Sequence, residues 1–153
     1  MIDAIGSYTP HARLSHAAGV PTVTSDDTSS VPAAAALAAA ADVTVLVLGT
    51  DTSVARENLD AVNLSYSLGQ IALVEAVAAA APRPVTLVTL SAVPLDPSPF
   101  LALPNVGAIL HAGQPSIQTH GVADVLFGAV SPAGRAVQTF YRPAYQDQIS
   151  IFD

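Results

Sequence analysis

Apolar and polar residues occur in blocks along the chain, and the blocks follow two different periods. An alanine-rich run at about residues 32–41 favours a helix, because alanine has the highest helix propensity. The β-branched run 43–48 follows and ends at Gly49, and its unbroken apolarity predicts a strand buried on both faces. Together these runs resemble a membrane span, but Asp42 and the change of period favour a helix followed by a strand.

The same succession of helix and strand recurs further along the chain. Ser67 and Gln70 fit a Ser-x-x-Gln capping box, which predicts a helix from about residue 68 to 81, stopped by Pro82. Its apolar residues fall at helical spacing: Leu68, Ile71, Val74, Val77 and Ala78. A strand at 85–90 follows, and residues 94–104 form a turn-rich stretch before a third strand at 106–110.

The last third of the chain predicts one more helix and an extended segment. A loop at 111–116 leads to a helix at about 117–127, with Gly128 as its C′ residue, and an extended segment follows at 136–141. Strands that alternate with helices imply right-handed crossovers. The predicted fold is therefore α/β, a three-layer α/β/α sandwich with a mostly parallel sheet. Residues 1–30 are polar and rich in Pro, Ser and Thr, so we expect an irregular N-terminal segment followed by one domain over 31–153.

Composition and charge exclude several classes of function. The chain has 5 Lys+Arg against 12 Asp+Glu, a net charge of −7, which argues against nucleic acid or an anionic membrane surface as a partner. All of the cations are arginine and there is no cysteine, so a Walker A loop, Schiff-base chemistry and thiol catalysis are excluded. The 4 histidines show no tight ligand spacing, and we expect no metal and no cofactor. The N-terminus also shows no secretory signal.

Candidate chemistry lies in the loops that follow the predicted strands. In an open parallel sheet these loops meet along one edge, which brings 49–60, 91–96 and 111–114 together. They carry an unusual share of the polar side chains, namely Asp51, Glu57, Asp60, Ser91, Asp96 and His111. Glu57 is the sharpest candidate for a general acid or base, whereas Glu75, inside a helix, is expected to be a surface charge. Structural roles stay open, since Asp51 and Ser91 could cap turns and His111 could be a hydrogen-bonded core residue.

Three other kinds of catalytic or binding site each lack a residue or motif that they need. Asp51 ends a strand, as the phosphoacceptor of bacterial receiver domains does, but the lysine that those domains need is absent. A Ser91, His111 and Asp124 triad lacks the G-x-S-x-G elbow that would expose the serine. No G-x-G-x-x-G follows a strand, so the dinucleotide fingerprint is missing too.

From about residue 41 to the C-terminus, the chain resembles the second, α/β-sandwich domain of family-3 glycoside hydrolases, in the β-xylosidase and α-arabinofuranosidase branch. Four stretches carry the resemblance through their order and spacing: residues 41–54, 90–96, 106–115, and 123–128 running into 131–135. In that family a preceding (β/α)8 barrel supplies an aspartate nucleophile, and this domain supplies the general acid/base from the loop after its first strand. Retention of configuration needs two carboxyl groups about 5 to 5.5 Å apart.

The resemblance also implies roles for individual residues. The loop in this branch resembles Asp-Gln-Ser-x-Glu-x-Glu-x-x-Asp-Arg. The matching residues here are Asp51, Ser53, Glu57 and Asp60, while Ala55 and Ala61 stand where the pattern has Glu and Arg. We therefore expect Glu57 to be the acid/base and Asp51, Ser53, Asp60, Ser91 and His111 to bind substrate or support the site. His111 replaces a tryptophan of many relatives, and Gln114-Pro115-Ser116 replaces a Tyr-Pro-Gly-like turn.

The expected function is thus part of a β-xylosidase-like, extracellular hydrolase that cleaves terminal bonds of xylo- or arabino-oligosaccharides. No barrel of about 250 residues fits in 153 residues. We therefore expect a fragment or split product, with a barrel domain as its partner and little activity alone. The Asn63-Leu64-Ser65 sequon suits a secreted relative. The alternative, favoured by Ala55 and Ala61, is a non-catalytic module that binds sugar or docks a partner.

Overall fold

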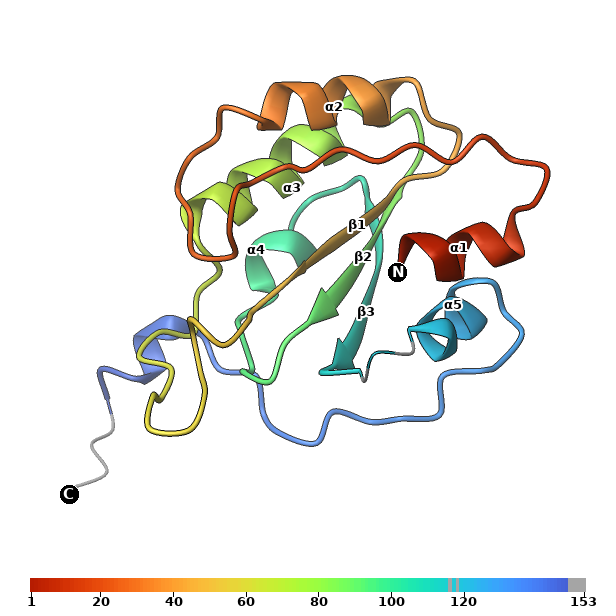
Figure 1. Cartoon of the computed structure of the whole chain (residues 1–153). Helices are drawn as coiled ribbons and strands as arrows, with labels where there is room; N and C mark the ends of the chain where they lie inside the picture. The colour runs from red at the N-terminus through yellow and green to blue at the C-terminus, as the bar shows by residue number, and fades with distance from the viewer. Residues whose placement is uncertain (116, 118, 149–153) are drawn as a thin grey trace.

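A three-stranded parallel sheet lies at the centre of the fold, in the order β1-β2-β3 (Figure 1). The computed structural model describes residues 1–115, 117 and 119–148. The strands are β1 (Val45–Gly49), β2 (Val85–Leu90) and β3 (Val106–Gly113). All three predicted strands are confirmed. β3 continues three residues beyond the predicted end, so His111 belongs to the strand and not to the loop after it.

Helices cover both faces of the sheet. The strand order moves in one direction, so right-handed crossovers place α3 (Leu68–Ala80) and α4 (Ser98–Leu101) on the same face. α2 (Val31–Ala39) packs on α3. α1 (Ile2–Tyr8) and α5 (His120–Leu126) contact each other on the opposite side (Figure 1). This arrangement confirms the predicted α/β sandwich, including the helices expected at 32–41 and 68–81.

The first 30 residues are irregular apart from α1, a helix that the sequence analysis did not predict. Its partners are distant in sequence. The Tyr8 hydroxyl donates to Asp124 Oδ1 at 2.6 Å, and the Tyr8 ring stacks on Phe127 with centroids 4.9 Å apart. Because a seven-residue helix containing glycine has little intrinsic stability, these contacts explain why α1 forms. The division of the chain at residue 30 stays a prediction.

The strands differ in burial according to their place in the sheet. Val85, Leu87 and Val88 of the central strand β2 are fully buried, on both faces. β1 lies at an edge of the described sheet, and its Val47 is 41% exposed. The prediction that this strand is buried on both faces is therefore wrong. An apolar run alone does not distinguish a central strand from an edge strand.

The apolar face of α3 is confirmed except at its first residue. Val74, Val77 and Ala78 are buried, whereas Leu68 is 67% exposed. Leu68 begins the helix, and its backbone N–H donates to Asp26 Oδ1 at 3.0 Å. Leu73, which is not among the predicted apolar residues of this helix, is buried.

Only one half of the predicted capping box forms. Ser67 Oγ accepts a hydrogen bond from the Gln70 backbone N–H at 3.3 Å. The Gln70 side chain instead turns inward, where Oε1 accepts from Gly49 N at 2.9 Å and Nε2 donates to Gly49 O at 3.1 Å. Nε2 also donates to Val23 O at 2.7 Å. This buried amide ties the first turn of α3 to the end of β1, where the candidate loop begins.

Replacing Gln70 with methionine is expected to lower the free energy of unfolding by about 1–3 kcal/mol, because it leaves the Gly49 N–H buried without a partner. Urea unfolding followed by circular dichroism measures the change. Glu75→Met is the matched control, since Glu75 is exposed on the same helix and its replacement should cost no more than about 0.5 kcal/mol. Equal losses in the two variants would contradict this role of Gln70.

The C-terminal part differs from its prediction in two places. α5 begins at His120, three residues later than expected, although Gly128 has the expected φ of 75°. The described chain forms no strand at 136–141. It runs back past the carboxyl ends of the strands, where the Phe140 ring meets His111 edge-on at 5.1 Å, and continues to the 3-10 turn η1 (Pro143–Tyr145) (Figure 1). Ser116 belongs to the predicted turn, Gln118 to the predicted helix, and residues 149–153 to the predicted domain. All of them lie outside the residues that the structure describes.

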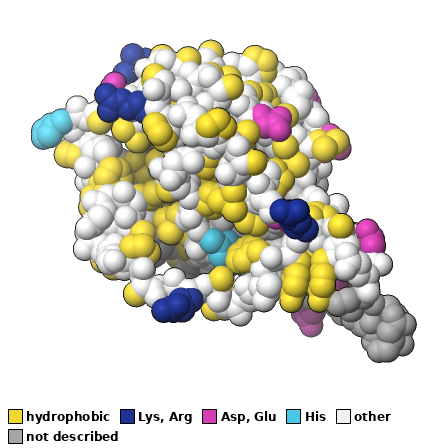
Figure 2. Space-filling view, turned by 180° about the vertical axis from the view of Figure 1, so that it is seen from behind, with side chains coloured by type: hydrophobic (Ala, Val, Ile, Leu, Met, Phe, Trp, Pro, Cys, Tyr) yellow, Lys and Arg dark blue, Asp and Glu magenta, His cyan; other side chains and the backbone are white. Residues whose placement is uncertain are grey.

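The surface carries few charges. Figure 2 shows the molecule from behind, where hydrophobic side chains occupy much of the face and charged groups are few, in agreement with a charged fraction of 11%. None of the helices in the described residues has the length and apolarity needed to cross a membrane.

Candidate functional site

Three loops meet at the carboxyl edge of the sheet, as predicted. The Thr50 N–H donates to Leu90 O at 3.0 Å, and the hydroxyls of Thr50 and Ser91 are hydrogen-bonded at 2.9 Å. A broad, open hollow of about 560 Å³ lies between the loops; we call it the edge hollow. All three loops contribute to its lining: Ala55, Arg56, Leu59, Asp60, Ala61, Leu64, Ala92, Val93, Pro94 and Gln114.

The loop after β1 begins with a compact turn. Asp51 Oδ1 accepts hydrogen bonds from the Ser53 N–H at 2.8 Å and from the Ser53 hydroxyl at 2.6 Å. The hydroxyl and then the backbone N–H of Ser53 hold the pKa of Asp51 below its usual value. Both residues are exposed, so this turn is made by local bonds and not by burial. The structure thus brings these two predicted residues together and gives Asp51 a turn-capping role.

Glu57 lies at the tip of a second turn. Arg56 and Leu59 pair through two backbone hydrogen bonds of 2.9 Å, and Asn58 adopts a left-handed φ of 64°. The turn presents Glu57 to solvent, beside the edge hollow and outside its lining. The local fold therefore fixes the backbone of Glu57 and leaves its carboxyl accessible to a group outside the described chain.

Asp60 lies between two hollows. It lines the edge hollow and also a second one of about 350 Å³, beside the end of β1 and the start of α3. Ser53 lines the second hollow as well. Of the predicted site residues, Asp60 and Ser53 are thus the two that reach a hollow.

Ser91 is buried and holds a turn. Its hydroxyl accepts from the Val93 N–H at 3.0 Å and donates to the Val93 carbonyl at 2.7 Å, and the residue is 2% exposed. A hydroxyl held in this way supports the loop that forms one wall of the edge hollow. A direct contact of Ser91 with substrate stays a prediction.

His111 belongs to a half-buried polar group at the end of β3. Its Nδ1 is hydrogen-bonded to Thr89 Oγ1 at 2.9 Å, and burial lowers the pKa of the imidazole. The lowered pKa favours the neutral form of the imidazole at neutral pH. Burial also raises the pKa of the nearby Tyr66 to about 12. His111 lines neither hollow, and its position suits a supporting role.

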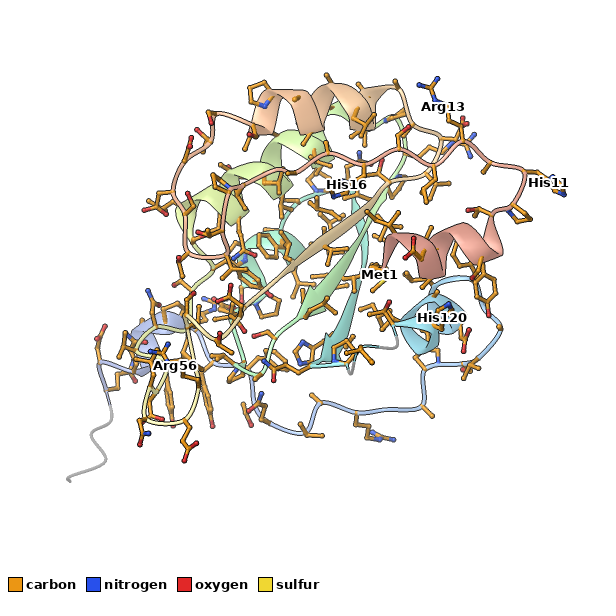
Figure 3. The ribbon with its side chains drawn as sticks, in the orientation of Figure 1. Met1, His11, Arg13, His16, Arg56 and His120 are labelled. Atoms are coloured by element: carbon orange, nitrogen blue, oxygen red, sulfur yellow. The ribbon has the colours of Figure 1, made fainter. Side chains whose placement is uncertain are left out.

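The other histidines lie away from this edge. In Figure 3, Arg56 projects from the loop after β1, whereas His11, His16 and His120 are on distant parts of the fold. Across residues 1–115, 117 and 119–148, no three His, Asp or Glu side chains are arranged to hold a metal ion.

Arg56 lies at the site although the sequence pattern did not predict it there. Its Nη1 donates to the Thr52 carbonyl at 2.7 Å, and the side chain lines the edge hollow together with Ala55 and Ala61. One signal was available, because Arg56 is the only cation in the loop at 49–60. The two alanines that depart from the expected pattern line this same hollow.

Comparison with known proteins agrees with this description. Residues 2–151 match the Glycosyl hydrolase family 3 C-terminal domain, so the match includes residues that precede the stretches that carry the sequence resemblance. The chain is 39% identical over 143 residues to Beta-D-xylosidase 1 of Arabidopsis thaliana, which covers 92% of this chain. It is 37% identical over 132 residues to Exo-1,4-beta-xylosidase bxlB of Emericella nidulans, which covers 86% of this chain.

Similarity to solved structures leads to the same family. A GH3 exo-beta-xylosidase (XlnD), solved with a xylobiose aziridine probe, superposes with a TM-score of 0.82 at 28% identity over 90% of this chain. The chain spans 18% of the length of that protein and 18% of the Arabidopsis relative. The chain therefore belongs to glycoside hydrolase family 3, as a C-terminal α/β-sandwich domain similar to those of β-xylosidases.

Proposed function

We propose that the chain is the acid/base-bearing part of a β-xylosidase-type hydrolase and completes its active site with a (β/α)8 barrel domain. The observation that supports this most directly is the position of Glu57. It is an exposed carboxyl on an ordered turn, beside an open hollow, in the loop where the family pattern places its acid/base. Terminal xylose units of oligosaccharides are the proposed substrate, because the curated relatives are β-xylosidases.

In the proposed reaction the two domains supply one carboxyl group each. The barrel carboxylate attacks the anomeric carbon, and Glu57 donates its proton to the glycosidic oxygen as that bond breaks. Water then releases the sugar from the glycosyl-enzyme, with Glu57 accepting a proton from the water.

The chain contributes the turn that positions Glu57 but not the attacking carboxylate. We therefore expect little turnover of an aryl β-xyloside by the chain alone, and clear turnover when it is produced together with a barrel domain of the family. The barrel domain alone is the control. Equal rates with and without the chain would contradict the proposed role. An extracellular location belongs to the same proposal and rests on the family resemblance.

A second candidate is a non-catalytic module that binds sugar. Ala55 and Ala61 favour it, since both line the edge hollow at positions where the family pattern has charged side chains. This candidate predicts that xylose binds to the isolated chain in calorimetric titration while the paired domains remain inactive. Absence of heat at millimolar xylose would exclude it.

A further inference from the structure

We propose that Arg56 and Asp60 form a two-point clamp for hydroxyl groups of a sugar ring in the edge hollow. The class of ligand, a neutral pyranose or furanose, rests on the proposed function. The choice of the two residues rests on the lining of the hollow and on the hydrogen bond that orients Arg56. Arg56 would donate to the sugar and Asp60 would accept from it.

The two charges share one hollow without neutralising each other. Both side chains line the edge hollow, yet within the described part of the chain they form no ion pair. The Arg56 guanidinium instead donates through Nη1 to the Thr52 carbonyl at 2.7 Å, which orients the side chain. A guanidinium has five N–H donors in a fixed fork, so this bond leaves donors free for a ligand.

The rest of the lining suits the apolar face of a sugar ring. Leu59, Leu64, Val93 and Pro94 supply apolar surface, and Gln114 adds an amide that donates and accepts. Polar groups placed among apolar side chains are typical of small-molecule sites. The volume of about 560 Å³ accommodates a sugar unit with its surrounding water.

Asp60 matches the family pattern, so Arg56 is the part of the clamp that the pattern does not predict. Arg56 occupies a position that the family pattern leaves variable, between Ala55, which replaces Glu, and the matching Glu57. Ala55 and Ala61 are short, so they leave space in the hollow beside Arg56. Arg56 thus supplies a cation to a loop that lacks the arginine of the family pattern. We assign it to substrate binding, separate from the proton transfer by Glu57.

The test is titration of the whole chain with xylobiose, followed by nuclear magnetic resonance or calorimetry. We expect millimolar binding to the unaltered chain, weakened about tenfold or more in Arg56→Ala, because hydrogen bonds to charged groups are lost. Arg13→Ala is the matched control, since Arg13 is exposed on a distant part of the fold (Figure 3) and should bind xylobiose as the unaltered chain does. Acyclic xylitol should bind more weakly than xylobiose, because it lacks a fixed ring.

A second variant distinguishes a loss of binding from a folding defect. Asp60→Asn preserves the shape of the side chain and removes its charge, and we again expect at least about tenfold weaker binding with an unchanged circular dichroism spectrum. Unaltered affinity in both variants, or no xylobiose binding to the unaltered chain, would overturn the clamp. Neither result bears on turnover by the paired domains, which tests the proposed function separately.

Discussion

Replacing Phe100 with alanine is expected to lower the free energy of unfolding by about 3–5 kcal/mol, the usual loss for a large aromatic side chain in a core. Phe100 is fully buried in α4. Its ring packs on Tyr66 with centroids 4.8 Å apart and an angle of 57° between the planes. Because domains of this size are stable by only about 5–15 kcal/mol, this loss is a large fraction of the total.

Urea unfolding followed by circular dichroism measures the effect, and Leu101→Ala is the matched control. Leu101 is the next residue of the same short helix and is 68% exposed, so its truncation should cost less than about 1 kcal/mol. If the two variants lose equal stability, Phe100 does not anchor α4 to the core. If the Phe100 variant does not fold, Phe100→Leu, with a smaller cavity, should give an intermediate loss.

The helix that holds Phe100, α4, is an element that hydrophobic periodicity did not predict. Residues 94–104 contain several prolines and were expected to be only turn-rich, yet α4 forms there. The helix is one turn long, so its stability comes from the burial of Phe100 and not from a repeated apolar pattern. By contrast, β2 and α3 have long, regular patterns, and both were predicted to within one residue at each end.

The remaining differences in the fold depend on contacts between distant residues. α1 is stabilised by Asp124 and Phe127, which lie more than 100 residues away, and local sequence carries no sign of them. The exposure of Val47 follows from the place of β1 at the sheet edge, which depends on strand order and not on the strand itself. The inward turn of the Gln70 side chain likewise needs Gly49 and Val23 as partners.

The candidate site was predictable in its location and less so in its details. The rule for parallel sheets brought the three loops together correctly. The hydroxyls of Thr50 and Ser91 join the first two, and Gln114 of the third lines the same hollow. The rule does not say which side chains turn outward. Ser91 is buried in its own turn, while Arg56 reaches the edge hollow. The direction in which a side chain points depends on the geometry of its turn, and the spacing of residues in the sequence does not determine that geometry.

Replacing Glu57 with glutamine is expected to lower kcat for xylobiose about 10²- to 10⁴-fold when the chain is paired with a barrel domain, since glutamine cannot donate or accept the proton. Glu57 has no partner in the described part of the chain that would make it structural, so circular dichroism and urea unfolding should be unchanged. Glu75→Gln is the matched control. It replaces the only other glutamate, which is exposed on α3, and turnover should stay within about twofold of the unaltered pair.

The most direct test compares two leaving groups in the paired domains carrying Glu57→Gln. Xylobiose has a sugar leaving group that must be protonated, whereas the dinitrophenolate of a dinitrophenyl β-xyloside departs without a proton. We predict that the substitution slows xylobiose cleavage strongly and leaves bond cleavage in the dinitrophenyl xyloside, measured as the initial burst, nearly unchanged. Equal slowing of both substrates, or no slowing of either, would contradict the assignment of Glu57 as the proton donor.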